Sequence, residues 1–439
     1  MTSDRVVPVA IIGGGFSGTI LAAQLARRGI RSALIDGSGR MGRGTAYSTS
    51  EPAHLLNVRA EGMSAWAGQG DHFAKRFEAE GGDRRGFAER RLFGRYIGEI
   101  LDEAVAGGSV ELIGQGATRA TRADGGWRVE LEDGGLVQSE AIALAVGNQE
   151  PEPLSAFSSA GRRFIRNPWG ADARDAVAGL VASGGSALLV GTGLTTVDLV
   201  LSLEAAGHRG KIMALSRRGL IPRSHADFDA APVELDELPE GDLLGLWRWL
   251  RKRGAHVGWR AAIDSLRPHS RALWQGLGDE RQRRFLRHAR PWWDVHRHRI
   301  APEVARTLAR LIGEGRLEVI AGRIISASET GEALEVDFRR RGSRERQSAS
   351  FAYAFNCTGP LHSIARSRDP LLRSLFDTGA IRADHLGIGL DVDDRARAGE
   401  RAWALGPLTK GRFWEIIAVP DIREQAAAVA DDIQEELGR

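Results

Sequence analysis

The sequence predicts an α/β protein with two domains of the same kind, and three observations support this prediction. An apolar run, a glycine turn, a helical pattern and a second apolar run follow one another over residues 7–36. The same order recurs over residues 186–219. Two more apolar runs, 141–148 and 351–359, each end in a glycine turn and stand before and after the second unit. Units of this length are typical of parallel, doubly wound (Rossmann-like) sheets.

These positions divide the chain into domains. We expect a first dinucleotide-binding domain over residues 1–155 and 351–439, with a second, over 156–225 and 311–350, inserted into it. Residues 226–310 are rich in Leu, Arg and Trp at helical spacing and contain several prolines, so they predict a helical insertion. The sequence that follows, "LEVIAGRIISASETGEALEVDFRRRG", predicts a β-hairpin with its turn at "ETGE".

The composition narrows the classes of protein. Cys357 is the only cysteine, which excludes an intramolecular disulfide, a cysteine-rich metal site and a redox-active cysteine pair. The net charge is only +3 and the arginines are interspersed with Asp and Glu, which argues against nucleic-acid binding. The N-terminus lacks a signal-peptide pattern and no apolar run is long enough to cross a bilayer, so we expect a cytoplasmic protein without a membrane partner.

The first glycine turn fits a dinucleotide-binding motif. Gly13, Gly15 and Gly18 follow G-x-G-x-x-G between a strand pattern and a helix pattern. These glycines permit the tight turn, the approach of a pyrophosphate and close helix packing, while the helix N-terminus favours the anion. Asp36 ends the second apolar run, where a carboxylate can accept hydrogen bonds from a ribose. We expect this site to include those four residues together with Phe16, Ser17 and Gly147.

The second glycine turn differs in two places. Gly191 and Gly193 match the motif, but Thr196 occupies the third glycine position. Where the first unit ends in an aspartate, the second ends in Ser216, Arg217 and Arg218. An arginine fork matches a 2′-phosphate, which a carboxylate would repel, so the sequence favours NADPH at this site. The alternative interpretation of the two arginines is a solvated turn.

The segment "RPWWDVHRHRIAP" concentrates aromatic and cationic residues. One interpretation places the tryptophans in a core and the histidines at the surface. The other makes His296, Arg297, His298 and Arg299 a cationic pocket for an anionic substrate, with His296, His298 and Arg299 as the substrate-anchoring candidates. A metal site is disfavoured, because residues i and i+2 lie on different faces of a helix.

Five stretches give the chain a family resemblance. They are "IIGGGFSG", "GTAYSTSEPAHLLNVRAEGMSAW", "LLVGTGLTTVDLVLSL", "RPWWDVHRHRIAP" and "GPLTKGRFWEIIAVPDIREQA". Over nearly its whole length the chain resembles the bacterial FAD/NAD(P)-binding proteins that include the flavin-dependent aspartate N-monooxygenases, which form nitrosuccinate. The resemblance implies FAD on Gly13, Gly15, Gly18 and Asp36.

The resemblance also implies which other segments lie near the flavin. One is the loop from Asn57 to Ser64, with Val58 and Met63. The other runs from Gly406 and Pro407 to a helix starting near Ile422, and would close over the pyrimidine end of the ring. The chain departs from Baeyer–Villiger and related flavin monooxygenases, whose F-x-G-x-x-x-H fingerprint is replaced by "FIRNPWG" without a histidine.

Two nucleotide sites without a cysteine pair indicate electron transfer from NADPH to FAD. The leading hypothesis is an FAD-dependent, NADPH-consuming monooxygenase that uses molecular oxygen on a small, carboxylated, anionic metabolite, with amino-acid N-hydroxylation among its reactions. A second hypothesis is a reductase or dehydrogenase that uses both cofactors without oxygen insertion. A third is a flavin-binding sensor without turnover. The sequence carries no signal for the oligomeric state.

Overall fold

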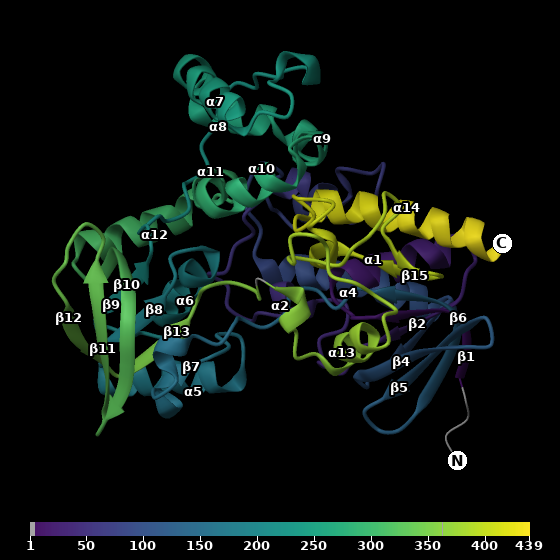
Figure 1. The fold of residues 1–439 in the computed structure, drawn as a ribbon, viewed down its shortest axis with the longest axis horizontal. Helices are drawn as coiled ribbons and strands as arrows, with labels where there is room; N and C mark the ends of the chain where they lie inside the picture. The colour runs from purple at the N-terminus through teal and green to yellow at the C-terminus, as the bar shows by residue number, and fades with distance from the viewer. Residues whose placement is uncertain (1–4, 362) are drawn as a thin grey trace.

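The computed structural model describes residues 5–361 and 363–439, so Met1 to Asp4 of the expected first domain lie outside the described part. Two sheet-containing domains lie side by side, and a group of helices lies above them (Figure 1). The predicted fold class, with two Rossmann-like parallel sheets, is confirmed. Within the described ranges, no helix is both long and apolar enough to cross a membrane.

The first domain is built on an eight-stranded sheet. Its strands are β1 (Arg5–Ile12), β2 (Ser32–Ile35), β3 (Val110–Ile113), β4 (Ala117–Ala123), β5 (Gly126–Leu131), β6 (Leu136–Leu144), β14 (Arg397–Gly399) and β15 (Ala402–Ala404). The order along the sheet is β14-β15-β6-β1-β2-β3, and β4 and β5 extend it antiparallel from β6. The centre of the sheet, β6-β1-β2-β3, is parallel throughout, as a dinucleotide-binding unit requires.

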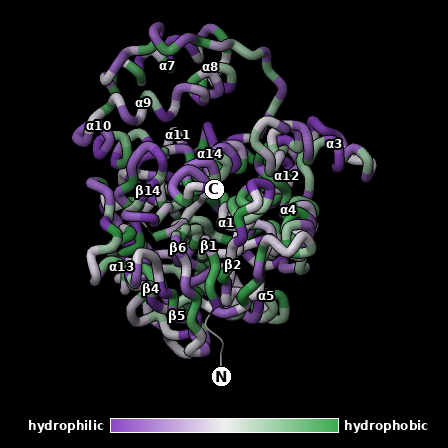
Figure 2. The backbone as a smooth tube through the Cα atoms, turned by 90° about the vertical axis from the view of Figure 1, so that its right-hand side faces the viewer, coloured by the Kyte–Doolittle hydropathy of each residue, from purple (hydrophilic) through white to green (hydrophobic). Residues whose placement is uncertain are grey.

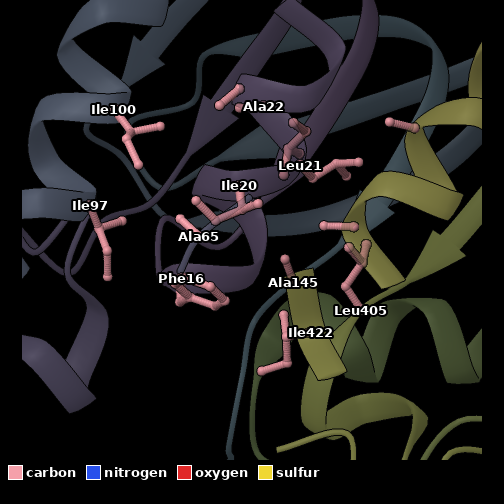
Figure 3. Close-up of a cluster of buried hydrophobic side chains, with 14 of the residues drawn as sticks. Phe16, Ile20, Leu21, Ala22, Ala65, Ile97, Ile100, Ala145, Leu405 and Ile422 are labelled. Carbon is pink, nitrogen blue, oxygen red and sulfur yellow. The ribbon is translucent and has the colours of Figure 1, made fainter. Parts of the chain in front are cut away.

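Helices cover both faces of this sheet. α1 (Phe16–Arg27) packs between α4 (Arg90–Ala106) and α14 (Val419–Leu437), which explains why ten of its residues are buried. Figure 3 shows this packing, with Ile20 and Leu21 of α1 among side chains from the loops and helices around it. α13 (Pro370–Asp377) covers the other face against β4. The connection from β2 to β3 also contains α2 (Gly44–Tyr47) and α3 (His72–Ala79).

The second domain has a seven-stranded sheet. Its strands are β7 (Phe164–Ile165), β8 (Ala187–Val190), β9 (Ile212–Ser216), β10 (Leu317–Thr330), β11 (Ala333–Arg340), β12 (Gln347–Phe351) and β13 (Tyr353–Asn356). The order is β12-β11-β10-β9-β8-β13-β7. Its helices are α5 (Ala171–Ser183), α6 (Leu194–Ala205) and α12 (Pro302–Gly313). The predicted hairpin is present as β10 and β11, which join where Thr330 pairs with Ala333.

Two predicted boundaries are wrong. The apolar run 351–359 was expected to re-enter the first domain, but β13 pairs in parallel with β8 and β7 of the second sheet. Its role in the second domain corresponds to that of β6 in the first, so the chain returns to the first domain only after Asn356. α12 was expected in the helical insertion, yet Val304, Leu308 and Leu311 belong to the apolar core of the second domain.

The helical insertion contains α7 (Leu243–Val257), α8 (Trp259–Ser265), α9 (Ser270–Gly276), α10 (Gly278–Arg284), a π-helical turn (Phe285–Ala289) and α11 (Arg290–Arg297). Figure 2 shows apolar and polar residues mixed along it, which is typical of thin helical layers. Trp274 attaches it to the C-terminal segment, because its indole N–H donates to the Gly411 carbonyl at 2.8 Å and its ring stacks on Trp414. The insertion therefore lies against the segment expected to close over the flavin.

Candidate functional site

The first glycine turn has the geometry of a nucleotide cradle. Gly13 has φ +108°, and a Cβ there would overlap the Ala145 carbonyl at the end of β6. The Gly13 N–H donates to the Ile35 carbonyl at 2.9 Å, so the turn crosses the carboxyl ends of β2 and β6. A Cβ at Gly18 would overlap the Gly13 carbonyl, so α1 can approach the strand only because this position is glycine. Open α/β sheets bind ligands at this edge.

The end of α1 that faces the turn is available to an anion. Gly15 is the N-cap residue, and no described side chain caps it, so the backbone N–H groups of the first helical turn stay free for a ligand. The Asp36 carboxylate accepts from the Gly14 N–H at 2.6 Å and from the Ser38 N–H at 2.7 Å. Asp36 therefore braces the turn and lies where the expected ribose contact would form.

Phe16 and Ser17 face the protein interior. The Phe16 ring is buried and contacts the rings of Tyr47 and Phe93, so its side chain is part of the core. Ser17 is buried against Gly406, where an added Cβ would lie 2.7 Å from the Ser17 Oγ. The cofactor contact of Phe16 stays a prediction, whereas Ser17 marks where the C-terminal segment meets the turn.

The segments implied to surround the flavin converge on α1. The Ser64 carbonyl accepts from Arg423 of α14 at 3.2 Å, and the Gly406 N–H donates to the Gln425 side chain at 2.7 Å. Met63 and Ile422 are buried in one apolar cluster. α14 begins at Val419, slightly before the expected start.

Three further residues of this predicted site lie around the same edge. Gly147 follows β6 with φ +68° and open space around the position of a Cβ. Val58 lies beside Gly62, and Pro407 begins a short 3-10 helix, Gly406–Thr409. The Asn57 carbonyl accepts from the His225 ring at 3.0 Å, which ties this loop to the segment before the insertion.

The second glycine turn reproduces the first. Gly191 has φ +128°, its Cβ would overlap the Cys357 carbonyl after β13, and its N–H donates to the Leu215 carbonyl at 2.8 Å. Gly193 is the N-cap residue of α6, with open space around it. Thr196 is buried beside the Cys357 thiol. Burial raises the pKa of Cys357 to about 12, so this cysteine stays a protonated thiol at neutral pH.

Arginines gather beside the second turn. The Ser216 hydroxyl shares a 2.8 Å hydrogen bond with Thr192 and accepts from the Gly219 N–H, so Ser216 shapes the turn. Arg217 is exposed and Arg218 half-buried. Burial and the nearby charges of Arg217 and Arg341 lower the pKa of Arg218. Sequence reasoning missed Arg341, which follows β11 and reaches this place because its N–H donates to the Ala321 carbonyl of β10, which pairs with Ser216 of β9.

Arg217, Arg218 and Arg341 are available to bind an anion. Among the described residues, no carboxylate forms an ion pair with Arg217, Arg218 or Arg341. By contrast, the neighbouring Arg340 is paired with Glu318 at 2.7 Å. A cluster of like charges without counter-ions at the end of the second strand fits a phosphate dianion.

The expected anchoring role of Arg299 is wrong. Its guanidinium binds the Asp264 carboxylate at 2.6 and 3.1 Å, and its other contacts are the carbonyls of His296 and Arg260. With 2% of its side chain exposed and each of its three nitrogens hydrogen-bonded within the protein, it is not placed to contact a substrate. His296 packs against the Trp259 ring and donates to the Trp292 carbonyl, on the outer side of the insertion.

His298 and Arg297 lie on the inner side. Burial lowers the pKa of His298, which favours the neutral imidazole despite the nearby Glu415 and Asp294. Arg297, which the sequence placed in the cationic segment without choosing it as an anchor, is buried 3.1 Å from Glu415. The direction in which each side chain of this segment points therefore decides which cation can contact a ligand.

The two domains are joined by a polar contact near both turns. Arg90 of α4 donates to both oxygens of Asp198 of α6 at 2.8 and 2.9 Å, with 16% and 7% of the two side chains exposed. His54 lies 3.0 Å from both the Asp198 carbonyl and the Ser202 hydroxyl. This contact fixes the distance between the two cradles.

Fold and site together define a protein with two nucleotide-binding cradles, each at the carboxyl edge of its own parallel sheet. A family model described as FAD-NAD(P)-binding matches residues 10–149, which contain the first cradle. The chain matches none of the curated proteins with which it was compared.

Solved structures match the chain over nearly its full length. An ornithine N-hydroxylase from Kutzneria sp. 744, with reduced FAD, NADP+ and L-ornithine, has TM-score 0.68 and 15% identity, covering 98% of this chain and 99% of that one. L-lysine 6-monooxygenase from Pseudomonas syringae has TM-score 0.64 and 16% identity, covering 98% and 100%. Thioredoxin reductase from T. acidophilum has TM-score 0.58 and 12% identity, covering 99% and 100%. The chain therefore has the fold shared by these flavin monooxygenases and reductases.

Proposed function

We propose that this protein is an FAD-dependent, NADPH-consuming monooxygenase acting on a small carboxylated metabolite, and that its reaction is the N-hydroxylation of an amino acid. The observation that carries the proposal is the duplicated cradle, in which Gly13 and Gly191 make matching turns while Asp36 follows the second strand of the first unit and Arg217 and Arg218 follow that of the second. The likeness to an ornithine N-hydroxylase and a lysine monooxygenase supports this reaction class.

Both cofactors fit the residues present. FAD would be held by the first turn, by Asp36 and by the free N–H groups of α1, and NADPH by the second turn with its arginines. Held there, the two groups would supply the two-electron reduction of molecular oxygen by NADPH, with one oxygen atom entering the substrate and the other leaving as water.

The chain's own residues would bind, orient and exclude water. The C-terminal segment closes against Ser17, and the N-terminus of α14 directs a positive end at the same region, which favours negative charge there. The insertion covers this segment through Trp274 and keeps the region dry.

The second candidate is a reductase, which the likeness to thioredoxin reductase keeps open. A route through a protein disulfide is excluded, because Cys357 has no second cysteine and its thiol is buried and protonated. A reductase that passes electrons from the flavin directly to an organic acceptor remains the competing function.

The deciding experiment follows NADPH oxidation under ¹⁸O₂ with each proteinogenic amino acid in turn. We expect one of them to accelerate oxygen uptake and to yield a product that carries ¹⁸O by mass spectrometry. Turnover of an organic acceptor at the same rate without oxygen would establish the reductase instead.

A further inference from the structure

A group of charges, buried at its centre and with Arg267 and Asp421 half-buried at its edge, lies between the helical insertion and the start of α14. Arg297 of α11 and Glu415 form its centre, with 3.1 Å from Nε to Oε2 and 8% and 7% of the side chains exposed. Arg267 approaches Asp421, in the first turn of α14, at 3.8 Å. Burial lowers the pKa of Arg267, and the nearby charge of Arg297 lowers it further.

These charges are close together without being hydrogen-bonded. Arg297 Nε and Nη2, Glu415 Oε2 and Asp421 Oδ2 are shielded from solvent, yet none has a hydrogen-bond partner in the described part of the chain. Buried charged atoms are normally satisfied, since leaving them unpaired is costly. Arg297 Nε and Glu415 Oε2 face each other at 3.1 Å in the ion pair, and Arg297 Nη2 and Asp421 Oδ2 have no hydrogen-bond partner in the described residues.

The orientation of Glu415 is fixed from one side. The Trp293 indole N–H donates to Glu415 Oε1 at 2.7 Å, which turns Oε2 toward Arg297 Nε. Trp293 also lines an apolar pocket with Leu266 and Trp414, so an apolar surface borders the charged group. Such a setting strengthens charge-assisted hydrogen bonds to a ligand.

The group also lies beside the segments expected to surround the flavin. Arg423, two residues after Asp421, donates to the Ser64 carbonyl at 3.2 Å. Ile422, between them, packs in the cluster that contains Phe16 of the first turn (Figure 3). The start of α14 thus connects the buried charges to the first cradle.

A nearby ion pair shows what a purely structural arrangement looks like. Arg299 and Asp264 belong to the same insertion and are just as close, but both carboxylate oxygens and the guanidinium nitrogens are hydrogen-bonded. Arg297, two residues earlier, has no hydrogen-bond partner for Nη2 in the described residues. The two arginines therefore differ in how completely the protein satisfies their donors.

We propose that Arg297 and Glu415, with Arg267 and Asp421, form the specificity pocket of this protein for a small molecule that carries both a carboxylate and an amino group. The arginines bind the carboxylate, and Glu415 and Asp421 bind the amino group. The assignment rests on the proposed function, because it places this molecule where the substrate of that reaction would bind.

The first test measures equilibrium binding to the FAD-loaded protein by titration calorimetry. The probes are the proteinogenic amino acids, followed by the deaminated acid and the decarboxylated amine of any that binds. We expect at least one amino acid to bind, with each analogue weaker by about tenfold or more, the effect of losing a hydrogen bond to a buried charge. Binding of no amino acid, or equal binding of the analogues, overturns the proposal.

The second test uses variants with a matched control. Arg297→Lys should weaken every carboxylate ligand by about tenfold, because a single ammonium cannot replace the planar fork. Glu415→Gln keeps an acceptor for Trp293 and should weaken the amino acid while leaving its deaminated analogue unchanged. The control Asp264→Asn alters the neighbouring ion pair and should lower the melting temperature without changing the affinity ratio.

The outcomes separate this inference from the proposed function. If Arg297→Lys and Glu415→Gln lower the melting temperature but leave the ratio of amino acid to analogue affinity unchanged, the group is structural. Anaerobic reduction of the flavin by NADPH without any amino-acid binding overturns the pocket alone. Amino-acid binding without NADPH-dependent reduction overturns the proposed function alone. The wild-type titration decides the case even where a variant fails to fold.

Discussion

Removing Arg217 and Arg218 beside the second turn should strongly reduce the preference of the protein for NADPH over NADH. Arg217 is exposed and Arg218 half-buried, so their hydrogen bonds to a 2′-phosphate differ in strength. A charge-assisted hydrogen bond contributes roughly 1.5–3 kcal/mol when desolvated and less when exposed. We assign about 1 kcal/mol to Arg217 and about 2 kcal/mol to Arg218 on this basis. The double variant Arg217→Gln/Arg218→Gln should then bind NADPH roughly 100-fold more weakly.

The assay is anaerobic stopped-flow reduction of the bound flavin over a range of NADPH and NADH concentrations. The apparent Kd for NADH should change little, because NADH lacks the phosphate that the arginines bind. Arg341→Gln, added to the double variant, should weaken NADPH further, since the Arg341 charge lies near Arg218. Arg174→Gln, on the exposed side of α5, is the control and should change neither Kd. Equal losses for NADPH and NADH would refute the phosphate assignment.

Three other substitutions test the cradle, the domain contact and the pH response. Gly191→Ala should abolish NADPH binding in calorimetry while FAD stays bound, because the added Cβ would overlap the Cys357 carbonyl. The control Gly207→Ala, at a residue with φ +86° and open space around the added Cβ, should only lower stability. Arg90→Gln leaves Asp198 buried without its partner and should lower the free energy of unfolding by about 2–4 kcal/mol in chemical denaturation. The control Arg59→Gln, whose partner Asp227 is exposed, should lower it by less than about 1 kcal/mol. Equal effects of the two substitutions would contradict this account. Burial lowers the pKa of His225 from 6.5 to about 4. Between these pH values the unfolded chain binds a proton at His225 that the folded protein does not bind, so stability should fall as the pH drops from 6.5 to 4. His225→Gln should flatten that part of a melting-temperature profile, and an unchanged slope would assign it to other groups.

Much of the fold was predictable because its signals are local. Each glycine turn, with the strand before it and the helix after it, lies within a short stretch of sequence, and the turn at Gly13 has the geometry that the motif predicts. The sheet to which a strand belongs is a long-range property. The runs that became β6 and β13 look alike, and only their pairing shows that β13 completes the second sheet.

Some residues of the candidate site could likewise be found from local sequence, and others depend on long-range contacts. Arg217 and Arg218 follow β9 directly and could be found from the sequence, whereas Arg341 reaches them through the pairing of β10 with β9. Arg297 and Arg299 look alike in the sequence, because each directly follows a histidine. Their partners, Glu415 and Asp264, come from distant segments, and these partners decide which arginine is free to bind a ligand.

The most direct test of the central claim is anaerobic mixing of the FAD-loaded protein with NADPH while the visible absorbance of the flavin is followed. The account predicts complete bleaching by a stoichiometric amount of NADPH, which shows that both nucleotides bind one chain close enough for hydride transfer. A flavin that dithionite reduces but that excess NADPH leaves fully coloured would contradict it.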